Sequence, residues 1–327
     1  MIWLTWRQSR VQFVIAALAL VVLALVYGLT ASGLNHLYAL YGTHPAVFLA
    51  QVRTGDYPVL FFVGGAVMYL VPLVTGAFWG APMIARELEA GTHRLAWNQS
   101  VSRRRWLLAK VGIGGGAVML VAGLASLLLT WWAAPIDKAG GFPVGTSQLS
   151  KFQPLVFGTR GIVPIGAAAL AFTIGVCVGL LLRRTIPAMA VTLGLFAALL
   201  VAMPLWVSPH LITPAQYTRP VVANLTTMAM TGDGQINDPV TGLPGAWVLS
   251  DQIITRSGSV FVLPPVAACQ TGTQAQCDAW LAAQPLRQRV VYQPASRYWA
   301  YQWAETAIWL ALTLGLCLVS VWRIRLS

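Results

Sequence analysis

Six apolar runs, each about as long as a bilayer is thick, set the pattern of this chain. They cover residues 11–32, 58–82, 106–134, 162–182, 186–207 and 303–322, with polar segments between them. An α-helix needs about 20 mostly apolar residues to cross the hydrocarbon core of a membrane. The pattern therefore predicts an all-α membrane protein with six transmembrane helices. No convincing small-residue cleavage site follows the first run, so we expect a retained helix rather than a signal peptide.

The polar segments divide the chain further. Residues 1–10 are expected to form an amphipathic connecting helix, and residues 11–207 the first five transmembrane helices with a polar loop at 83–105. Residues 208–302 are rich in Pro, Gly, Thr, Gln and Asn, and the block 278–284 predicts a short helix. This length is enough for a small extracellular domain between the fifth and sixth helices, and loops packed on the helix ends are the alternative. Residues 303–327 complete the sixth helix and a cytoplasmic tail.

Composition and charge support a membrane location. Hydrophobic residues make up 57% of the 327 residues and charged residues only 9%, whereas soluble domains carry about 25% charged residues. The net charge of +12 is explained by the positive-inside rule, because Lys and Arg crowd the short segments beside the predicted helix ends. Both termini are therefore expected in the cytoplasm. Nucleic-acid binding is disfavoured, since no basic helix with stacking aromatic residues stands out.

The cysteines and histidines give little reason to expect a metal. Cys177 and Cys317 lie in apolar runs and are expected to act as small hydrophobic residues. Cys269 and Cys277 lie in the predicted outer segment, where an oxidising compartment would allow a disulfide. Their spacing is poor for zinc without a nearby histidine pair. The four histidines are scattered along the sequence.

The polar segment between the second and third apolar runs is the most informative part of the sequence. A loose helical stripe of apolar residues alternates there with charged residues, and Gly91 is suited to end a helix. The apolar positions are Ile84, Leu88, Leu95 and Trp97, and the charged ones are Arg86, Glu87, Glu89 and Arg94. Such a segment must face water. An ordinary basic loop that obeys the positive-inside rule is the alternative.

Three stretches of the sequence resemble ABC-2-type transporter permeases. Arg86-Glu87-x-x-x-Gly91-Thr92, followed by 99–103 and the helix start at 106–110, resembles the coupling-helix region of that family. The opening stretch 3–8 and the late block 292–305 are similar to six-span actinobacterial permeases. The resemblance extends over the whole six-span layout, although the long segment before the sixth helix departs from the smallest members.

The resemblance implies a dimer in the bacterial plasma membrane, formed with a second copy of this chain or with a related permease, in which each permease docks one cytoplasmic ATPase. The residues expected to couple to the ATPase are Arg86, Glu87, Glu89, Gly91 and Thr92. Those expected at the membrane interface, facing lipid head groups, are Trp3, Trp6, Arg7 and Arg10. The chain has no Gly-x-x-x-x-Gly-Lys-Ser/Thr loop. We therefore expect no enzyme activity and no cofactor in this chain, with ATP and Mg bound by the partner ATPase.

Charged residues inside the predicted helices are almost absent, and Glu305 near the outer end of the sixth helix is the exception. Its partner could be Arg297 or a residue on another helix, and its role an interfacial anchor or an outer gate. The absence of mid-span carboxylates disfavours proton-coupled transport. The sequence thus favours an ATP-driven exporter of a small amphiphilic or lipidic cargo. The alternative is a non-transporting membrane sensor or resistance scaffold with a ligand-binding outer domain, whereas an enzyme would need a nucleophile–base pair or paired carboxylates.

Overall fold

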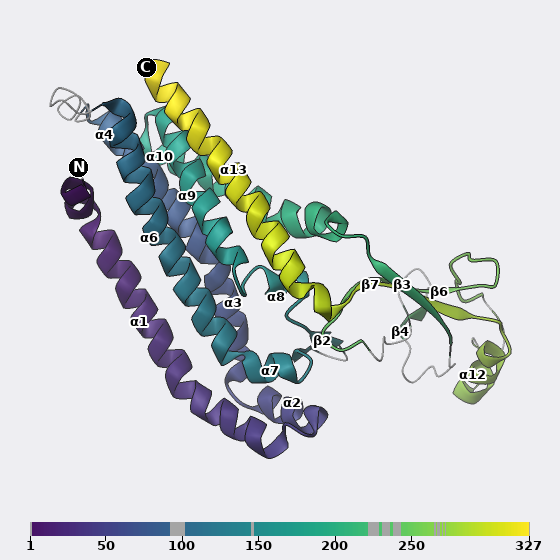
Figure 1. Cartoon of the computed structure of the whole chain (residues 1–327). Coiled ribbons are helices and arrows are strands. Elements are labelled where there is room, and N and C mark those ends of the chain that lie inside the picture. Colours follow the sequence, from purple (N-terminus) through teal and green to yellow (C-terminus); the bar gives the residue numbers. More distant parts are fainter. Residues whose placement is uncertain are drawn as a thin grey trace. The chain divides into compact units, whose positions relative to one another are not determined.

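The computed structural model divides the chain into two compact units, Met1–Leu211 with Trp299–Ser327, and Ile212–Tyr298 (Figure 1). The described residues are 2–91, 102–144, 147–221, 229–230, 236–237, 243–264, 266, 269, 271 and 273–326. The first unit is a helical bundle and the second is built around a small sheet.

Within these described residues, six helical segments are long and apolar enough to cross a membrane, which confirms the predicted number of spans. The segments are α1 (Ile2–Tyr41), α3 to α4 (Tyr57–Val74, then η1 Thr75–Gly80, then Ala81–Glu89), α6 (Arg103–Trp132), α9 (Val163–Leu182), α10 (Thr185–Ala202, continued by η2 Met203–Val207 and η3 Ser208–His210) and α13 (Tyr298–Leu326). Short elements join them: α2 (Pro45–Thr54), α7 (Ala134–Lys138), the hairpin β1 (Phe142–Val144) and β2 (Ser147–Leu149), and α8 (Pro154–Phe157).

The first helix is longer than its apolar run. It begins at Ile2 and continues to Tyr41, so residues 2–10, expected as a connecting helix, belong to the same helix as the first span. Its first turns run in a different direction from the remainder (Figure 1). Residues 33–41, which lie beyond the apolar run, continue the helix although hydropathy alone does not include them in the span.

Helix α9 forms the centre of the bundle. In its most apolar window 83% of the residues are buried, against 6% in the corresponding window of α1. It packs against α3, η1, α4, α6 and α10. A helix that is surrounded by other helices must be apolar on every side, which accounts for the apolar, small-residue sequence of α9.

Two Gly-x-x-x-Gly pairs bring α9 into close contact with the second span. Gly76 and Gly80 lie in η1, and Gly175 and Gly179 lie in α9. A Cβ atom added at Gly76 would lie 2.6 Å from the carbonyl oxygen of Ala171, and one at Gly179 would lie 2.8 Å from the carbonyl oxygen of Ala81. Small residues let helix backbones approach in a membrane, so these four glycines set the spacing of the two helices.

The wide π-helical turns η1 and η2 each adjoin a proline. Pro82 follows η1, and Pro204 lies within η2. A proline lacks the N–H group of a regular helical turn and pushes away the carbonyl one turn earlier. The Ala81 N–H instead donates to the Gly76 carbonyl, and the Ser208 N–H to the Met203 carbonyl.

The second unit is a folded domain rather than a set of loops. Its strands β3 (Ala215–Pro220), β7 (Arg287–Gln293) and β6 (Trp247–Ile254) form an antiparallel sheet in the order β3–β7–β6, and β4 (Ala229–Met230) pairs with β5 (Ile236–Asn237). The predicted short helix is α12, Gln274–Ala282, which starts earlier than expected because Thr273 caps it. Cys269 and Cys277 form a disulfide, with Cα atoms 4.6 Å apart. Cys277 also packs with Ile253, Leu281 and Leu286 in the small core of this unit.

Candidate functional site

The end of α4 and its contacts with α6 and α10 form the candidate site. We use the name α4 junction for Arg86, Glu87, Glu89 and Gly91 together with Lys110 and Thr185. Ile84 is fully buried, whereas Arg86 and Glu89 are exposed. This amphipathic pattern holds one face of α4 on the bundle and leaves the other accessible.

Gly91 ends the helix, as its residue type predicts. The Ala90 N–H donates to the Arg86 carbonyl, and the Gly91 N–H to the Leu88 carbonyl at 3.3 Å. Gly91 has a φ of 69°, which is the left-handed conformation that glycine adopts without strain. A Cβ atom there would meet nothing within 4 Å. The conformation, rather than space, therefore requires glycine at this position.

Glu87 forms a buried ion pair with α6. The Lys110 ammonium donates to Glu87 Oε1 at 2.6 Å and to the Met83 carbonyl at 3.4 Å. The Lys110 side chain is 5% exposed and that of Glu87 is 18% exposed. The ammonium also lies 5.1 Å from the centre of the Trp106 ring. A charged side chain expected at a helix end thus lies inside the bundle and holds α4 against α6.

Glu89 holds α4 to the hairpin between α9 and α10. Its Oε2 accepts hydrogen bonds from the Thr185 N–H at 2.9 Å and from the Thr185 hydroxyl at 2.7 Å. Thr185 is the first residue of α10, so the carboxylate also lies at the positive end of that helix dipole. The hairpin is tight: α9 ends at Leu182, Arg183 turns the chain with a φ of 53°, and α10 begins at Thr185.

The remaining coupling and interface residues are placed less completely. Thr92 and the rest of 92–101 lie outside the described residues, as do the side chains of Trp3, Trp6 and Arg7 on α1. Arg10 is exposed near the start of α1, and Arg103, Arg104 and Arg105 are exposed at the start of α6. In the part of the chain that the structure describes, the Arg86 side chain takes part in no ion pair.

Glu305 pairs with another helix, and the alternative partner Arg297 is wrong. Glu305 is 5% exposed. Its Oε2 accepts from the Ser208 hydroxyl at 3.0 Å, and its Oε1 from the Trp309 indole at 3.4 Å. The Arg297 guanidinium instead donates to the Thr213 carbonyl at 2.7 Å and to Gln293 Oε1 at 2.9 Å. Glu305 therefore joins α13 to the end of the fifth span.

Gln302, in the late block of the sequence, caps the central helix. Its Oε1 accepts from the N–H groups of Ile162 and Val163 at 2.9 and 3.1 Å, and its Nε2 donates to the Phe157 carbonyl at 3.3 Å. The first N–H groups of a helix have no partner within the helix. A buried glutamine from α13 supplies that partner, which gives this part of the block a structural role.

A second ion pair, between Asp137 and Arg160, lies in the connecting elements and was not anticipated. Arg160 Nη1 donates to Asp137 Oδ2 at 3.2 Å, and Arg160 is 1% exposed. Burial raises the pKa of Asp137 above its ordinary value, although the charges of Arg160 and Lys151 act in the opposite direction. Neither residue lies in a recognisable motif, so only three-dimensional proximity reveals the pair.

These features define a polytopic membrane protein whose second span ends in an amphipathic, glycine-terminated segment joined to two neighbouring helices. The model of the ABC-2 membrane transporter related family matches residues 13–208, and the chain belongs to that family. It is thus a membrane permease of an ABC transporter. No curated protein and no solved structure matches it.

Proposed function

We propose that this chain is the permease subunit of an ATP-driven exporter that works as a dimer with two separate ATPase subunits. Each ATPase would dock at the α4 junction and the adjoining residues 92–101. The observation that carries the proposal is the arrangement of α4. Its exposed residues are open to a partner, while Glu87 joins α4 to α6 and Glu89, itself exposed, joins α4 to α10.

Force applied at this end would reach the bundle by two routes. A displacement of α4 would act on α6 through the Glu87–Lys110 ion pair and on α10 through the Glu89–Thr185 hydrogen bonds. The close backbone contact at Gly76 and Gly175 leaves little room for independent sliding against α9. The second span, the hairpin and α6 would therefore move as a connected group.

Two observations support a cytoplasmic α4 junction and an extracellular second unit. Basic residues gather at the helix ends of the α4 junction, as the positive-inside rule requires of a cytoplasmic side. They are Arg86, Arg103, Arg104, Arg105, Arg183, Arg184 and Arg323. The Cys269–Cys277 disulfide in the second unit is suited to an oxidising compartment.

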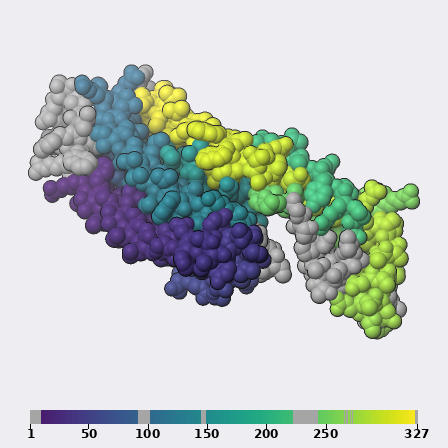
Figure 2. Space-filling model, turned by 60° about the horizontal axis from the view of Figure 1, so that its bottom comes forward, coloured from purple at the N-terminus to yellow at the C-terminus, as the bar shows by residue number. Residues whose placement is uncertain are grey.

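The exposed face of α1 supports a dimer that carries an apolar or amphiphilic cargo. Figure 2 shows α1, in purple, forming a continuous part of the surface. That face carries Val14, Leu18, Val22, Leu25 and Leu29, all more than half exposed. Lipid or a second copy would cover such a surface in the membrane, and a pathway beside it would suit a small amphiphile.

Affinity purification of the tagged chain from native membranes tests the proposal. The expected result is the recovery of a polypeptide with a phosphate-binding loop, whose ATP hydrolysis changes when the permease is present. Gly91→Ala should weaken this association, because alanine is strained at a φ of 69°. Gly116→Ala is the matched control, since a Cβ atom there meets nothing within 4 Å.

Recovery of the wild-type chain without any ATPase would contradict the proposal and favour the sensor or scaffold alternative. Equal recovery of the ATPase with Gly91→Ala and with Gly116→Ala would retain the transporter but remove the α4 junction as its docking point.

A further inference from the structure

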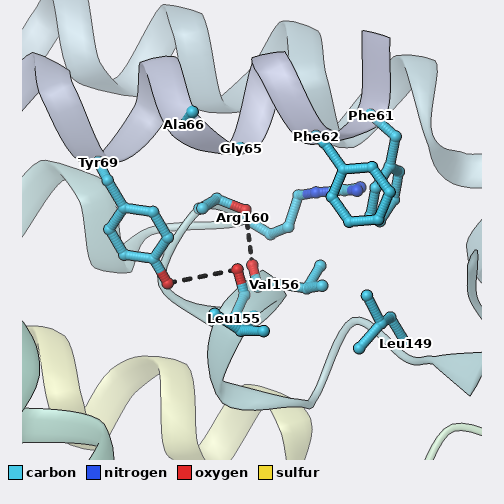
Figure 3. A pocket seen from close by; sticks show the side chains of 10 residues that line it. Phe61, Phe62, Gly65, Ala66, Tyr69, Leu149, Leu155, Val156 and Arg160 are labelled. Carbon is cyan, nitrogen blue, oxygen red and sulfur yellow. Dashed lines mark hydrogen bonds between the residues drawn. The ribbon is translucent and has the colours of Figure 1, made fainter. Parts of the chain in front are cut away.

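A cavity of about 180 Å³ lies in the first unit, between α3 and the connecting segment 149–160. Figure 3 shows it among the side chains of Phe61, Phe62, Tyr69, Leu155 and Arg160. Phe62 is 48% exposed and Leu155 is 71% exposed. The cavity is therefore open to the surroundings of the unit.

The lining is apolar and aromatic with one cationic side chain. Phe61 stacks on Phe142 with ring centres 4.6 Å apart, and the Arg160 guanidinium carbon lies 5.2 Å from the centre of the Phe61 ring. The Arg160 side chain extends toward the two phenylalanine rings (Figure 3). An aromatic wall of this kind favours a flat ring, which packs well at the edge or face of a phenylalanine.

Arg160 brings a hydrogen-bond donor but no net charge. Its charge is balanced by Asp137, which accepts from Nη1 at 3.2 Å. Its Nε is buried and has no hydrogen-bond partner among the described residues. A buried donor without a partner is unfavourable, so an acceptor oxygen that reached Nε would be stabilised there. An anionic oxygen would also have to compete with the Asp137 carboxylate.

Tyr69 shows that the opposite wall has no such unused donor. Its hydroxyl donates to the Pro154 carbonyl at 3.0 Å, which leaves only the phenol oxygen available to a ligand. The polar demand of the cavity is therefore one acceptor on the ligand, directed at Arg160.

We propose that this cavity binds a neutral, ring-sized apolar group that carries one hydrogen-bond acceptor oxygen, such as a phenyl ketone or the corresponding part of a larger amphiphile. A cavity of 150 Å³ in another protein holds benzene, so the volume here suits one ring with a small substituent. The site shares no residue with the α4 junction, and its test is independent of the ATPase.

Fluorine NMR titration of the purified full chain, reconstituted in lipid nanodiscs, tests the site with three matched probes. They are 4-fluoroacetophenone, which is neutral with an acceptor; 4-fluoroisopropylbenzene, which lacks the acceptor; and 4-fluorobenzoate, which is anionic. We expect saturable binding of the ketone that is on the order of tenfold tighter than that of the hydrocarbon. Binding of the benzoate should be weaker than that of the ketone.

Three variants test whether the ketone binds in this cavity. Ala66→Leu fills the cavity that Ala66 lines and should abolish saturable ketone binding. Val63→Leu, on the same helix, 54% exposed and outside the lining, is the control and should leave binding intact. Arg160→Lys keeps a cation beside Asp137 but removes Nε, so the preference for the ketone over the hydrocarbon should become smaller.

Three results would overturn the proposal. They are equal affinities of the ketone and hydrocarbon for the wild-type chain, unchanged binding to Ala66→Leu, and benzoate binding tighter than the ketone. All three are measured on chains with an intact Arg160–Asp137 pair, so they decide the question even if Arg160→Lys fails to fold.

Discussion

The Glu87–Lys110 ion pair predicts an asymmetric cost of mutation. Replacing Glu87 by leucine leaves the Lys110 ammonium, 5% exposed, without its carboxylate. Removal of one partner from a buried pair costs about 3 kcal/mol or more of the free energy of unfolding. Replacing Lys110 by methionine leaves Glu87, whose side chain is 18% exposed and can turn toward water. Loss of a hydrogen bond to a charged group then costs about 1.5 kcal/mol.

The double variant separates the energy of the Glu87–Lys110 interaction from the other effects of each substitution. Glu87→Leu with Lys110→Met puts two apolar side chains where a buried pair stood, which is often neutral within about 1 kcal/mol. The sum of the single costs is about 4.5 kcal/mol, so the coupling energy in a double-mutant cycle should be at least about 3.5 kcal/mol. The wild type, the two single variants and the double variant should be purified in one detergent, and their thermal stabilities measured side by side give their order of stability.

The reasoning fails if Lys110→Met is as destabilising as Glu87→Leu, or if the double variant is less stable than either single one. Under the proposed function the double variant has a second use. It should fold like the wild type yet transmit less of the ATPase movement to α6, so ATP hydrolysis and transport should become uncoupled without loss of the complex.

The other predictions concern separate parts of the chain. Gly175→Leu should prevent close contact of α9 with the second span and cost about 3 kcal/mol or more, seen as loss of monodisperse protein. Gly112→Leu is the control and should not show this loss, since a Cβ atom at Gly112 meets nothing within 4 Å. Glu89→Ala should remove the cap at the start of α10 and speed hydrogen exchange there, whereas unchanged exchange would exclude the cap. Cys269→Ser should cost about 2 kcal/mol by opening a loop of sequence separation 8, read as faster proteolysis of the second unit alone. Because burial raises the pKa of Asp137 above its ordinary value of 3.8, its contribution to stability is greatest below that value and declines as the pH rises through the raised pKa. Asp137→Asn should remove that decline, and an identical pH profile would refute the cause.

The membrane-spanning part of the fold is predictable from the sequence because it depends on length and hydropathy. The same criteria do not single out the central helix, because the mean hydropathy of the most apolar window of α9 is 2.4, between 2.7 for α1 and 1.9 for the last span. What distinguishes α9 is its content of small residues, with Gly175 and Gly179 one helical turn apart. Gly76 and Gly80 in the second span form the facing Gly-x-x-x-Gly pair, and the two pairs together could have predicted this close contact.

The sequence motif predicts where the candidate site lies but not which residues its side chains contact. Glu87 and Glu89 were expected to face an ATPase, yet each carboxylate is paired with a residue of the same chain, Lys110 or Thr185. These partners lie 23 and 96 positions away in the sequence. Only the order in which helices pack decides which charges meet, and hydropathy carries no information on that order.

This internal use of both carboxylates changes what a docking partner would meet. Glu87 forms an ion pair with Lys110, and Glu89 accepts a hydrogen bond from Thr185, whereas Arg86 is exposed on the same helix. Arg104 and Arg105 are exposed at the start of α6. The exposed charged residues at this end of the bundle, Arg86, Arg104 and Arg105 against Glu89, therefore carry a net positive charge. An ATPase groove that fits it should carry acidic residues, because complementary charge sets the register and the rate of association. Under the proposed function, these arginines would select the partner, and Glu87 and Glu89 would pass its movement to α6 and α10.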